Sequence, residues 1–238
     1  MHVLIARDAD ELAGIAADVF RERVCARPEL AMAVPAGRTP RRMYARMATL
    51  QARDPIDYAR MRIFSVDELC PPAPADGYFW RQVRSEFLSW AKVDPARCRP
   101  FTVDAVDLDT MCATYETAIA QAGGLDLVML GLGPNGHLAS NEPGCAFDVR
   151  TRPVRLLDST VRYILTDDVI QGDVCERAVT LGLATIMAAR EVIVLVSGEA
   201  KRAPLARLLD GPITPDVPAS VLRRHPRCLV ITDRAARP

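Results

Sequence analysis

Short apolar runs alternate with amphipathic stretches along most of the chain. The apolar runs predict buried strands over residues 30–35, 61–66, 125–130, 191–196 and 229–232, with a weaker strand over 154–157. The amphipathic stretches predict helices over residues 8–27, from 39 onward, and over 76–90, 107–121, 176–189 and 197–209. Strands separated by helices indicate an α/β fold, with an open, mainly parallel sheet covered by helices on both faces. Because no repeat or long linker divides the chain, we expect residues 1–238 to form a single domain.

Composition narrows the possible partners. Thirty basic and thirty acidic residues leave no net charge, which argues against nucleic acid or an acidic membrane surface as a partner. No apolar run approaches the roughly 18 residues of a membrane span, and the N-terminus lacks a signal-peptide pattern. The seven cysteines form no Cys-x-x-Cys pair, and the three histidines lie far apart in sequence. We therefore expect a reduced, cytoplasmic, metal-free protein that is a monomer or a small homo-oligomer.

The ends of four predicted strands carry polar residues, in segments 36–39, 67–68, 131–142 and 197–201. In open α/β sheets, ligands bind beyond the carboxyl ends of the strands. We therefore expect these four segments to line one crevice. Their convergence indicates an active site more strongly than any one of them does alone.

The glycine-rich turn after residues 125–130 brings an acid–base pair to this crevice. His137 is followed five residues later by Glu142, and either Asn135 or Glu142 is placed to hydrogen-bond a nitrogen of the imidazole. A positioned imidazole is the usual group for general acid–base chemistry. We therefore interpret His137 as a catalytic residue rather than a histidine of the core.

The glycine spacing over residues 131–136 also matches the dinucleotide-binding fingerprint. That fingerprint requires a helix that starts inside the glycine run. The Asn-Glu-Pro-Gly run at 141–144 stops any such helix, because proline and glycine both oppose helix interiors. A dinucleotide site is therefore the weaker alternative.

Asp67 follows the apolar strand predicted over 61–66. Burial at this position raises the pKa of a carboxyl group and makes it a competent base. The alternative is that Asp67 caps a helix or loop. Glu68 is the fallback for the same role, although its side chain is expected to point to the other face.

Two segments are candidates for holding an anion. The turn after residues 30–35 reads Ala36, Gly37, Arg38 and Thr39. Thr39 is expected to cap a helix whose first residue is Pro40, so that backbone N–H groups and a hydroxyl meet a phosphate. Lys201 falls in the first turn of another predicted helix, where the helix dipole disfavours a cation and a bound anion would compensate. The simpler alternatives are an ordinary capped turn and a solvated lysine.

In these motifs the chain resembles the glucosamine-6-phosphate deaminase (isomerase) family, within the larger group that includes 6-phosphogluconolactonases. The matching segments, in order, are 36–40, 64–68, 131–143, 150–152, 180–182, 198–201 and 218–226. The resemblance implies a Rossmann-like fold and an enzyme that converts glucosamine 6-phosphate and water to fructose 6-phosphate and ammonia. It implies no redox cofactor and no obligatory metal.

The resemblance also implies a role for each candidate. His137 is the general acid that opens the sugar ring, supported by Glu142 and Asn135, and Asp67 moves the proton at C2. The phosphate is held by residues of the first turn and by the lysine: Ala36, Gly37, Arg38, Thr39 and Lys201.

Two departures keep other functions open. Asn135 stands where many members have aspartate, and Ser140 replaces a common phenylalanine, which gives the lactonase-like sequence His-Leu-Ala-Ser. The alternatives are a sugar-phosphate lactone hydrolase and a non-catalytic domain that binds sugar phosphates. The Asn-Glu-Pro motif at 141–143 favours the deaminase, because lactonases have Leu-Phe-Pro there.

Overall fold

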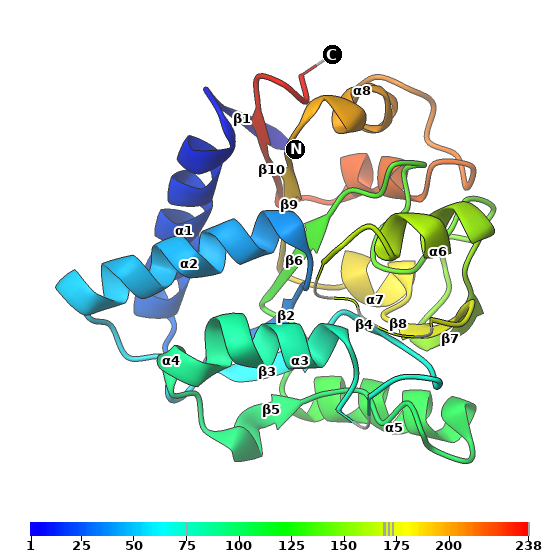
Figure 1. The fold of residues 1–238 in the computed structure, drawn as a ribbon, viewed down its shortest axis with the longest axis horizontal. Coiled ribbons are helices and arrows are strands. Elements are labelled where there is room, and N and C mark those ends of the chain that lie inside the picture. Colours follow the sequence, from blue (N-terminus) through cyan, green and yellow to red (C-terminus); the bar gives the residue numbers. More distant parts are fainter. Residues whose placement is uncertain (75, 169, 171, 173, 238) are drawn as a thin grey trace.

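The computed structural model describes residues 1–74, 76–168, 170, 172 and 174–237 (Figure 1). Within these residues, seven strands form one sheet in which every neighbouring pair is parallel. From edge to edge they are β1 (His2–Ala6), β10 (Cys228–Asp233), β9 (Glu191–Val196), β6 (Leu127–Gly131), β2 (Ala31–Val34), β3 (Arg62–Ser65) and β5 (Cys98–Arg99). The predicted fold class is confirmed, although β1 and β5 were not among the predicted strands.

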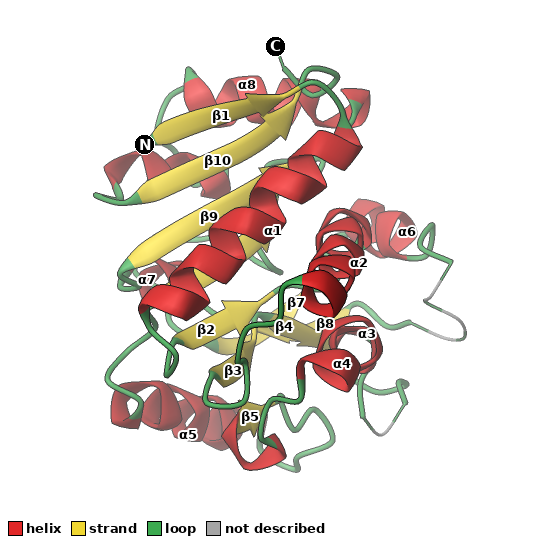
Figure 2. Ribbon diagram, turned by 90° about the vertical axis from the view of Figure 1, so that its left-hand side faces the viewer, coloured by secondary structure: helices red, strands yellow, loops and turns green. Residues whose placement is uncertain are grey.

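Helices cover both faces of this sheet (Figure 2). One face carries α1 (Ala9–Ala26), α2 (Arg38–Arg53) and a helix made of α3 (Phe79–Val83), the π-helical turn Arg84–Leu88 and α4 (Ser89–Ala91). The other face carries α5 (Leu108–Gln121), α7 (Leu183–Met187), α8 (Arg202–Leu209) and the 3-10 segment Pro218–Arg224.

The buried strands explain why both faces are covered. All six residues of β9 are buried. Ile193 and Leu195 pack on the α1 and α2 side, and Val192 and Val194 pack on the α7 and α8 side. Alternate residues of a strand point to opposite faces, so a continuously apolar strand needs helices on both. No helix in the described part of the chain is long and apolar enough to cross a membrane.

A smaller antiparallel sheet stands beside the main one. Its strands, in spatial order, are β4 (Asp67–Leu69), β8 (Arg177–Thr180) and β7 (Arg152–Arg155), with α6 (Asp158–Ile164) next to them in the chain. Neither this sheet nor α6 was predicted, apart from the weak strand over 154–157, which overlaps β7. The chain leaves the main sheet after β3 and enters the small sheet at Asp67, so this residue lies where the two sheets meet.

The helix predicted over residues 176–189 is wrong in its first half. Val179 and Thr180 are fully buried between β4 and β7, where β-branched side chains fit an extended strand. Gly182 then allows a close crossing of the chain. A Cβ there would lie 2.2 Å from the carbonyl oxygens of Val149 and Arg150. The helix α7 begins only after this crossing.

Candidate active site

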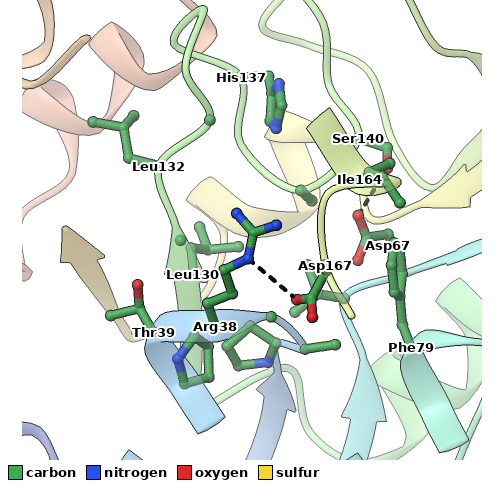
Figure 3. Close-up of a pocket in the computed structure, with 18 of the residues that line it drawn as sticks. Arg38, Thr39, Asp67, Phe79, Leu130, Leu132, His137, Ser140, Ile164 and Asp167 are labelled. Atoms are coloured by element: carbon green, nitrogen blue, oxygen red, sulfur yellow. Dashed lines mark hydrogen bonds and ion pairs between the residues drawn. The ribbon is translucent and has the colours of Figure 1, made fainter. Parts of the chain in front are cut away.

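A cavity of about 180 Å³ lies beyond the carboxyl ends of β2, β3, β6 and β9 (Figure 3). The predicted site residues that line it are Ala36, Gly37, Arg38, Thr39, Asp67, His137 and Lys201. Asn135 and Glu142 do not line it, because they lie behind His137. The four polar segments therefore meet at one place, as expected for the strand ends of an open α/β sheet.

Asp67 opens β4 and turns its carboxylate into the cavity (Figure 3). Its Oδ2 accepts a hydrogen bond of 2.7 Å from the hydroxyl of Ser140. Burial raises the pKa of Asp67 to about 6, although the Ser140 hydrogen bond and the nearby His137 both act to lower it. A carboxyl group with this pKa is ionised at neutral pH and is still basic enough to take a proton from carbon.

Glu68 points away from the cavity, as its position in the strand predicts. Its Oε1 accepts the backbone N–H groups of Leu69, Tyr78 and Phe79, and its Oε2 accepts that of Trp80. Three of these donors lie at the start of α3, where helix geometry leaves N–H groups without partners. Glu68 therefore fixes α3 to β4 and is not available as the fallback base.

The loop after β6 is shaped by its glycines. The N–H of Gly133 donates to the carbonyl of His137 at 3.0 Å, and Gly136 has φ of +92°. A Cβ on Gly133 would lie 2.3 Å from atoms of the His137 ring, so only glycine lets the imidazole lie against the loop. Residues 131–144 contain no helix, so the dinucleotide alternative lacks the helix N-terminus that it requires.

His137 faces a carboxylate on its inner side. Its Nδ1 lies 3.6 Å from Oε2 of Glu142, which leaves the opposite nitrogen, Nε2, for the cavity. Burial acts to raise the pKa of Glu142, but polar contacts with His137, Thr160 and Asn135 outweigh it and lower the pKa to about 2. Glu142 is therefore ionised and presents a negative charge to the inner side of the imidazole.

Asn135 acts differently from the sequence interpretation, which placed it or Glu142 on the ring. Its Nδ2 donates to Glu142 Oε2 at 2.8 Å, and its Oδ1 accepts the backbone N–H of His137 at 3.0 Å. The amide therefore orients the carboxylate and the loop rather than the imidazole itself.

The N-terminus of α2 forms the other end of the cavity. The helix begins at Arg38, with Gly37 in the preceding cap position at φ of +112°. The prediction that Thr39 caps this helix is wrong, because Thr39 is its second residue and the structure shows no side-chain cap. The N–H groups of Arg38 and Thr39 have no acceptor within the helix, which suits this end to an anion.

Two cations flank one aromatic ring at the same end. The Nζ of Lys201 lies 4.6 Å from the centroid of the Tyr163 ring, and the guanidinium carbon of Arg38 lies 5.5 Å from it. Lys201 is the last residue of a 3-10 turn, Glu199–Lys201, and precedes α8 instead of lying in its first turn. Tyr163, on α6, brings the two side chains together through cation–π contacts.

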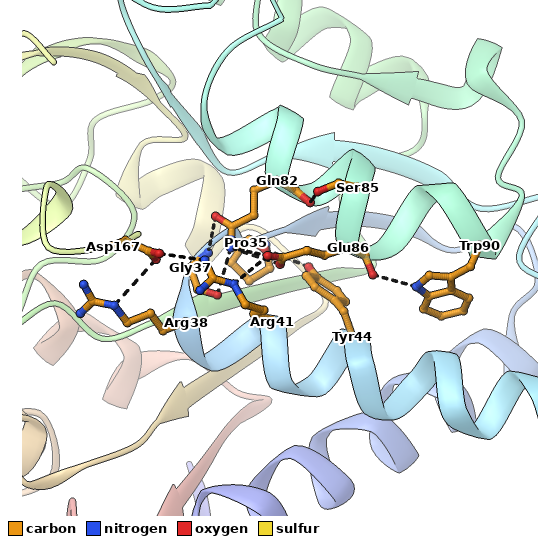
Figure 4. Close-up of polar contacts among 10 residues, drawn as sticks. All are labelled: Pro35, Gly37, Arg38, Arg41, Tyr44, Gln82, Ser85, Glu86, Trp90 and Asp167. Atoms are coloured by element: carbon orange, nitrogen blue, oxygen red, sulfur yellow. Dashed lines mark hydrogen bonds and ion pairs between the residues drawn. The ribbon is translucent and has the colours of Figure 1, made fainter. Parts of the chain in front are cut away.

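An acidic residue shares this end of the cavity. Asp167 forms ion pairs of 2.9 Å with Arg41 and 3.8 Å with Arg38, and Arg41 also pairs with Glu86 at 2.7 Å (Figure 4). Gln82 joins the network by accepting the N–H of Gly37 at 3.2 Å. These contacts fasten the start of α2 to the neighbouring helix and surround it with balanced charge.

Sequence reasoning did not assign functions to Tyr163 and Asp167, and it noted Ser140 only as a departure from the family pattern. Tyr163 and Asp167 belong to the unpredicted segment around α6. No local pattern marked them.

Within the described residues, no group of His, Cys, Asp and Glu side chains is arranged to hold a metal ion.

The chain is similar in sequence to a known protein family. The family model of glucosamine-6-phosphate isomerases/6-phosphogluconolactonase matches residues 5–231. Glucosamine-6-phosphate deaminase 2 of Bacillus subtilis (strain 168) is 33% identical over 242 residues, which cover 99% of this chain and 96% of the relative. Glucosamine-6-phosphate deaminase of Cutibacterium acnes is 36% identical over 241 residues, covering 99% of this chain and 91% of the relative.

Solved structures of similar proteins have the same fold. A monomeric glucosamine-6-phosphate deaminase superposes on this chain with a TM-score of 0.93 at 28% identity, over 99% of this chain and 98% of that one. The 6-phosphogluconolactonase of Trypanosoma brucei shares the fold, with a TM-score of 0.79 at 23% identity over 99% of this chain and 97% of that one. The chain therefore belongs to the glucosamine-6-phosphate isomerase/6-phosphogluconolactonase family.

Proposed function

We propose that the protein is an enzyme that isomerises and deaminates an amino-sugar 6-phosphate, converting glucosamine 6-phosphate and water to fructose 6-phosphate and ammonia. The observation that carries this proposal is the cavity itself. A carboxylate base, Asp67, and an imidazole backed by a carboxylate, His137, line it at one end, and cationic groups line the other. The curated relatives named above bear the name of this activity.

The chemistry follows from these positions. Nε2 of His137 donates a proton to the ring oxygen as the sugar opens. Glu142 holds the inner side of the imidazole, and Asn135 orients the Glu142 carboxylate. Asp67 then takes the proton from C2, while the electron pair forms a C1–C2 double bond and the C1 oxygen is protonated. Return of the proton to C1 gives an imine at C2, which water hydrolyses to the ketose phosphate and ammonia.

The phosphate is placed at the opposite end. The turn before α2 supplies the backbone of Ala36 and Gly37, and the first turn of α2 supplies the N–H groups and side chains of Arg38 and Thr39. Lys201 supplies an ammonium group. Backbone N–H groups at a helix start and fixed cations are the usual ligands of a phosphate. Held there, the sugar extends toward Asp67 and His137.

The proposed reaction also bears on the cofactor, the partners and the oligomeric state. Proton transfers of this kind need no redox cofactor. The equal numbers of acidic and basic residues support a small-molecule substrate and not nucleic acid or a membrane surface. We propose a cytoplasmic enzyme that acts as a monomer or a small homo-oligomer, in keeping with the monomeric deaminase of similar structure.

The test is incubation with glucosamine 6-phosphate, with ammonia and fructose 6-phosphate measured as products. 6-Phosphogluconolactone is assayed in parallel, because Ser140 completes a lactonase-like sequence beside His137. Asp67→Asn should abolish ammonia release and leave sugar-phosphate binding, measured by calorimetry, nearly intact. Lactone hydrolysis without ammonia would instead indicate a lactonase, and binding without turnover of either compound would indicate a non-catalytic domain.

A further inference from the structure

Ser140 contacts the reactive end of Asp67 directly. Its hydroxyl donates to Oδ2 of Asp67 at 2.7 Å, and the serine itself is only 4% exposed (Figure 3). A serine hydroxyl has one proton to donate, and here the carboxylate receives it. A hydrogen bond to an ionised acceptor is shorter and stronger than one between neutral groups.

Ser140 is held in place independently of Asp67. Its backbone N–H donates to Oγ1 of Thr180 at 3.1 Å. The preceding residue, Ala139, adopts φ of +51°, and the amide of Asn141 donates to the carbonyls of Leu138 and Leu181 at 3.0 and 2.8 Å. The turn is therefore tied to β8.

The same strand also sets the position of the base. Asp67 is paired with Thr180 in the β4–β8 ladder. Ser140 and Asp67 are thus both fixed to one residue of β8, although they lie 73 positions apart in the chain. Their contact is a consequence of how the small sheet is assembled, and it does not depend on flexible side chains meeting by chance.

We propose that Ser140 is a positioning residue for the C2 base: its hydroxyl fixes the plane of the Asp67 carboxylate through Oδ2 and leaves Oδ1 as the oxygen that exchanges a proton with the sugar. This inference rests on the proposed function. When the C2–H bond breaks, its electron pair forms the C1–C2 double bond, the proton is carried on Oδ1, and the same oxygen returns it to C1.

The charges around Asp67 support this role. His137, from the loop after β6, faces the carboxylate, and Glu68 follows it in β4 with its side chain turned to α3. At the other end of the cavity, Arg38 is paired with Asp167. Because burial acts to raise the pKa of Asp67, the donor on Oδ2 keeps the group ionised at neutral pH.

A second buried serine provides a matched control. Ser65 is 2% exposed, and its hydroxyl also contacts Asp67, but it donates to the backbone carbonyl at 3.0 Å. Ser65→Ala and Ser140→Ala each remove one buried hydroxyl bonded to the same residue. Only Ser140→Ala removes the donor to the carboxylate, whereas a purely structural effect would appear in both variants.

The experiment compares Ser140→Ala, Ser140→Thr and Ser65→Ala with the wild type. The first readout is the pH dependence of kcat and KM for ammonia release. The second is a carbon-13 NMR titration of aspartate carboxyls, with the Asp67 signal assigned by its loss in Asp67→Asn. The titration requires no turnover.

For Ser140→Ala, we expect the Asp67 titration and the acidic limb of kcat to move up by about one pH unit, which is the size expected for a lost hydrogen bond to a charged group. We also expect kcat to fall roughly tenfold and KM to stay within about twofold, because the contact orients a base and does not bind the phosphate. Ser140→Thr, which keeps the hydroxyl, should restore both values, and Ser65→Ala should change neither.

An unchanged Asp67 titration in Ser140→Ala would overturn the proposal, and so would an equal effect of Ser65→Ala. Failure of the proposed function has a different signature. If the wild type releases no ammonia from glucosamine 6-phosphate, the proposed reaction is wrong, and the NMR titration alone still decides whether Ser140 controls the Asp67 carboxylate.

Discussion

The side-chain amide of Asn135 donates to Oε2 of Glu142 at 2.8 Å, the same oxygen that lies 3.6 Å from Nδ1 of His137. The amide thus acts on the imidazole through the carboxylate. An aspartate in this position would place a second negative charge beside Glu142 instead of a donor. The asparagine therefore allows Glu142 alone to carry the charge that the imidazole meets.

Asn135→Ala tests this contact, because it removes the donor to Glu142 and the acceptor for the backbone of His137. We expect kcat to fall roughly tenfold and KM to change little, because a misplaced general acid affects the reaction more than substrate binding. Steady-state kinetics of ammonia release measure both constants. An unchanged kcat would show that Glu142 holds the imidazole without help.

Gly133→Ala tests the close packing of the His137 ring. The added Cβ would lie 2.3 Å from ring atoms, so the imidazole must move. We expect kcat to fall on the order of 100-fold, since a displacement of about 1 Å at a catalytic group has this effect. In a His137→Ala background, the same glycine substitution should cost no further activity. An additive loss in the double variant would mean that the glycine acts on something other than the ring.

Asp67→Asn should stabilise the protein at neutral pH. Folding raises the pKa of Asp67 from its ordinary value of 3.8 to about 6, with burial as the main cause. The native state therefore binds more protons than the unfolded chain in this range, so the free energy of unfolding of the wild type falls as pH rises from 3.8 to about 6. Because asparagine does not ionise, the free energy of unfolding of the variant does not contain this pH-dependent decrease.

We expect the Asn variant to be more stable above about pH 6 by roughly 1–2 kcal/mol, after allowance for solvent in the cavity, and equally stable near pH 3. Urea unfolding at several pH values measures the difference. Asp18→Asn, on the exposed side of α1, is the control for removal of an acidic side chain outside the cavity. A constant difference at every pH would contradict the proposed linkage.

Lys201→Ala tests the anion end of the cavity. We expect KM to rise roughly 10- to 100-fold, the size expected for loss of a charged hydrogen bond, with a smaller effect on kcat. The control is Arg202→Ala, one residue further on, whose side chain donates to the carbonyl of Ala235 at 3.2 Å and does not line the cavity. Equal effects of the two substitutions would indicate that Lys201 acts only through the overall charge of the surface.

Local signals in the sequence predicted much of the site. An apolar strand followed by Asp67 and a glycine-rich loop that leads to His137 are both short-range patterns. The general rule for strand ends then placed these segments together. Helix start positions were less accurate: Gly37, not Thr39, precedes α2, because a glycine with φ of +112° makes the turn possible without a side-chain cap.

The remaining contacts depend on long-range pairing. The register of β4 against β8 decides that Ser140 meets Asp67, and nothing near either residue encodes that register. The same small sheet explains why the helix predicted over 176–189 is partly wrong. The apolar residues of β8 suit a helix as well as a strand until β4 and β7 are placed on either side.

The short strand β4 carries two adjacent carboxylates that point in opposite directions. Asp67 points into the cavity, and Glu68 accepts hydrogen bonds from the start of α3. Successive side chains of a strand leave it in opposite directions. Gain or loss of a single residue ahead of Asp67 would therefore turn each acid to the opposite face of the strand. Glu68 would then point toward the sugar, and the N–H groups at the start of α3 would lose their acceptor. The reactive acid and the supporting acid therefore keep their separate roles only while the register of β4 is unchanged.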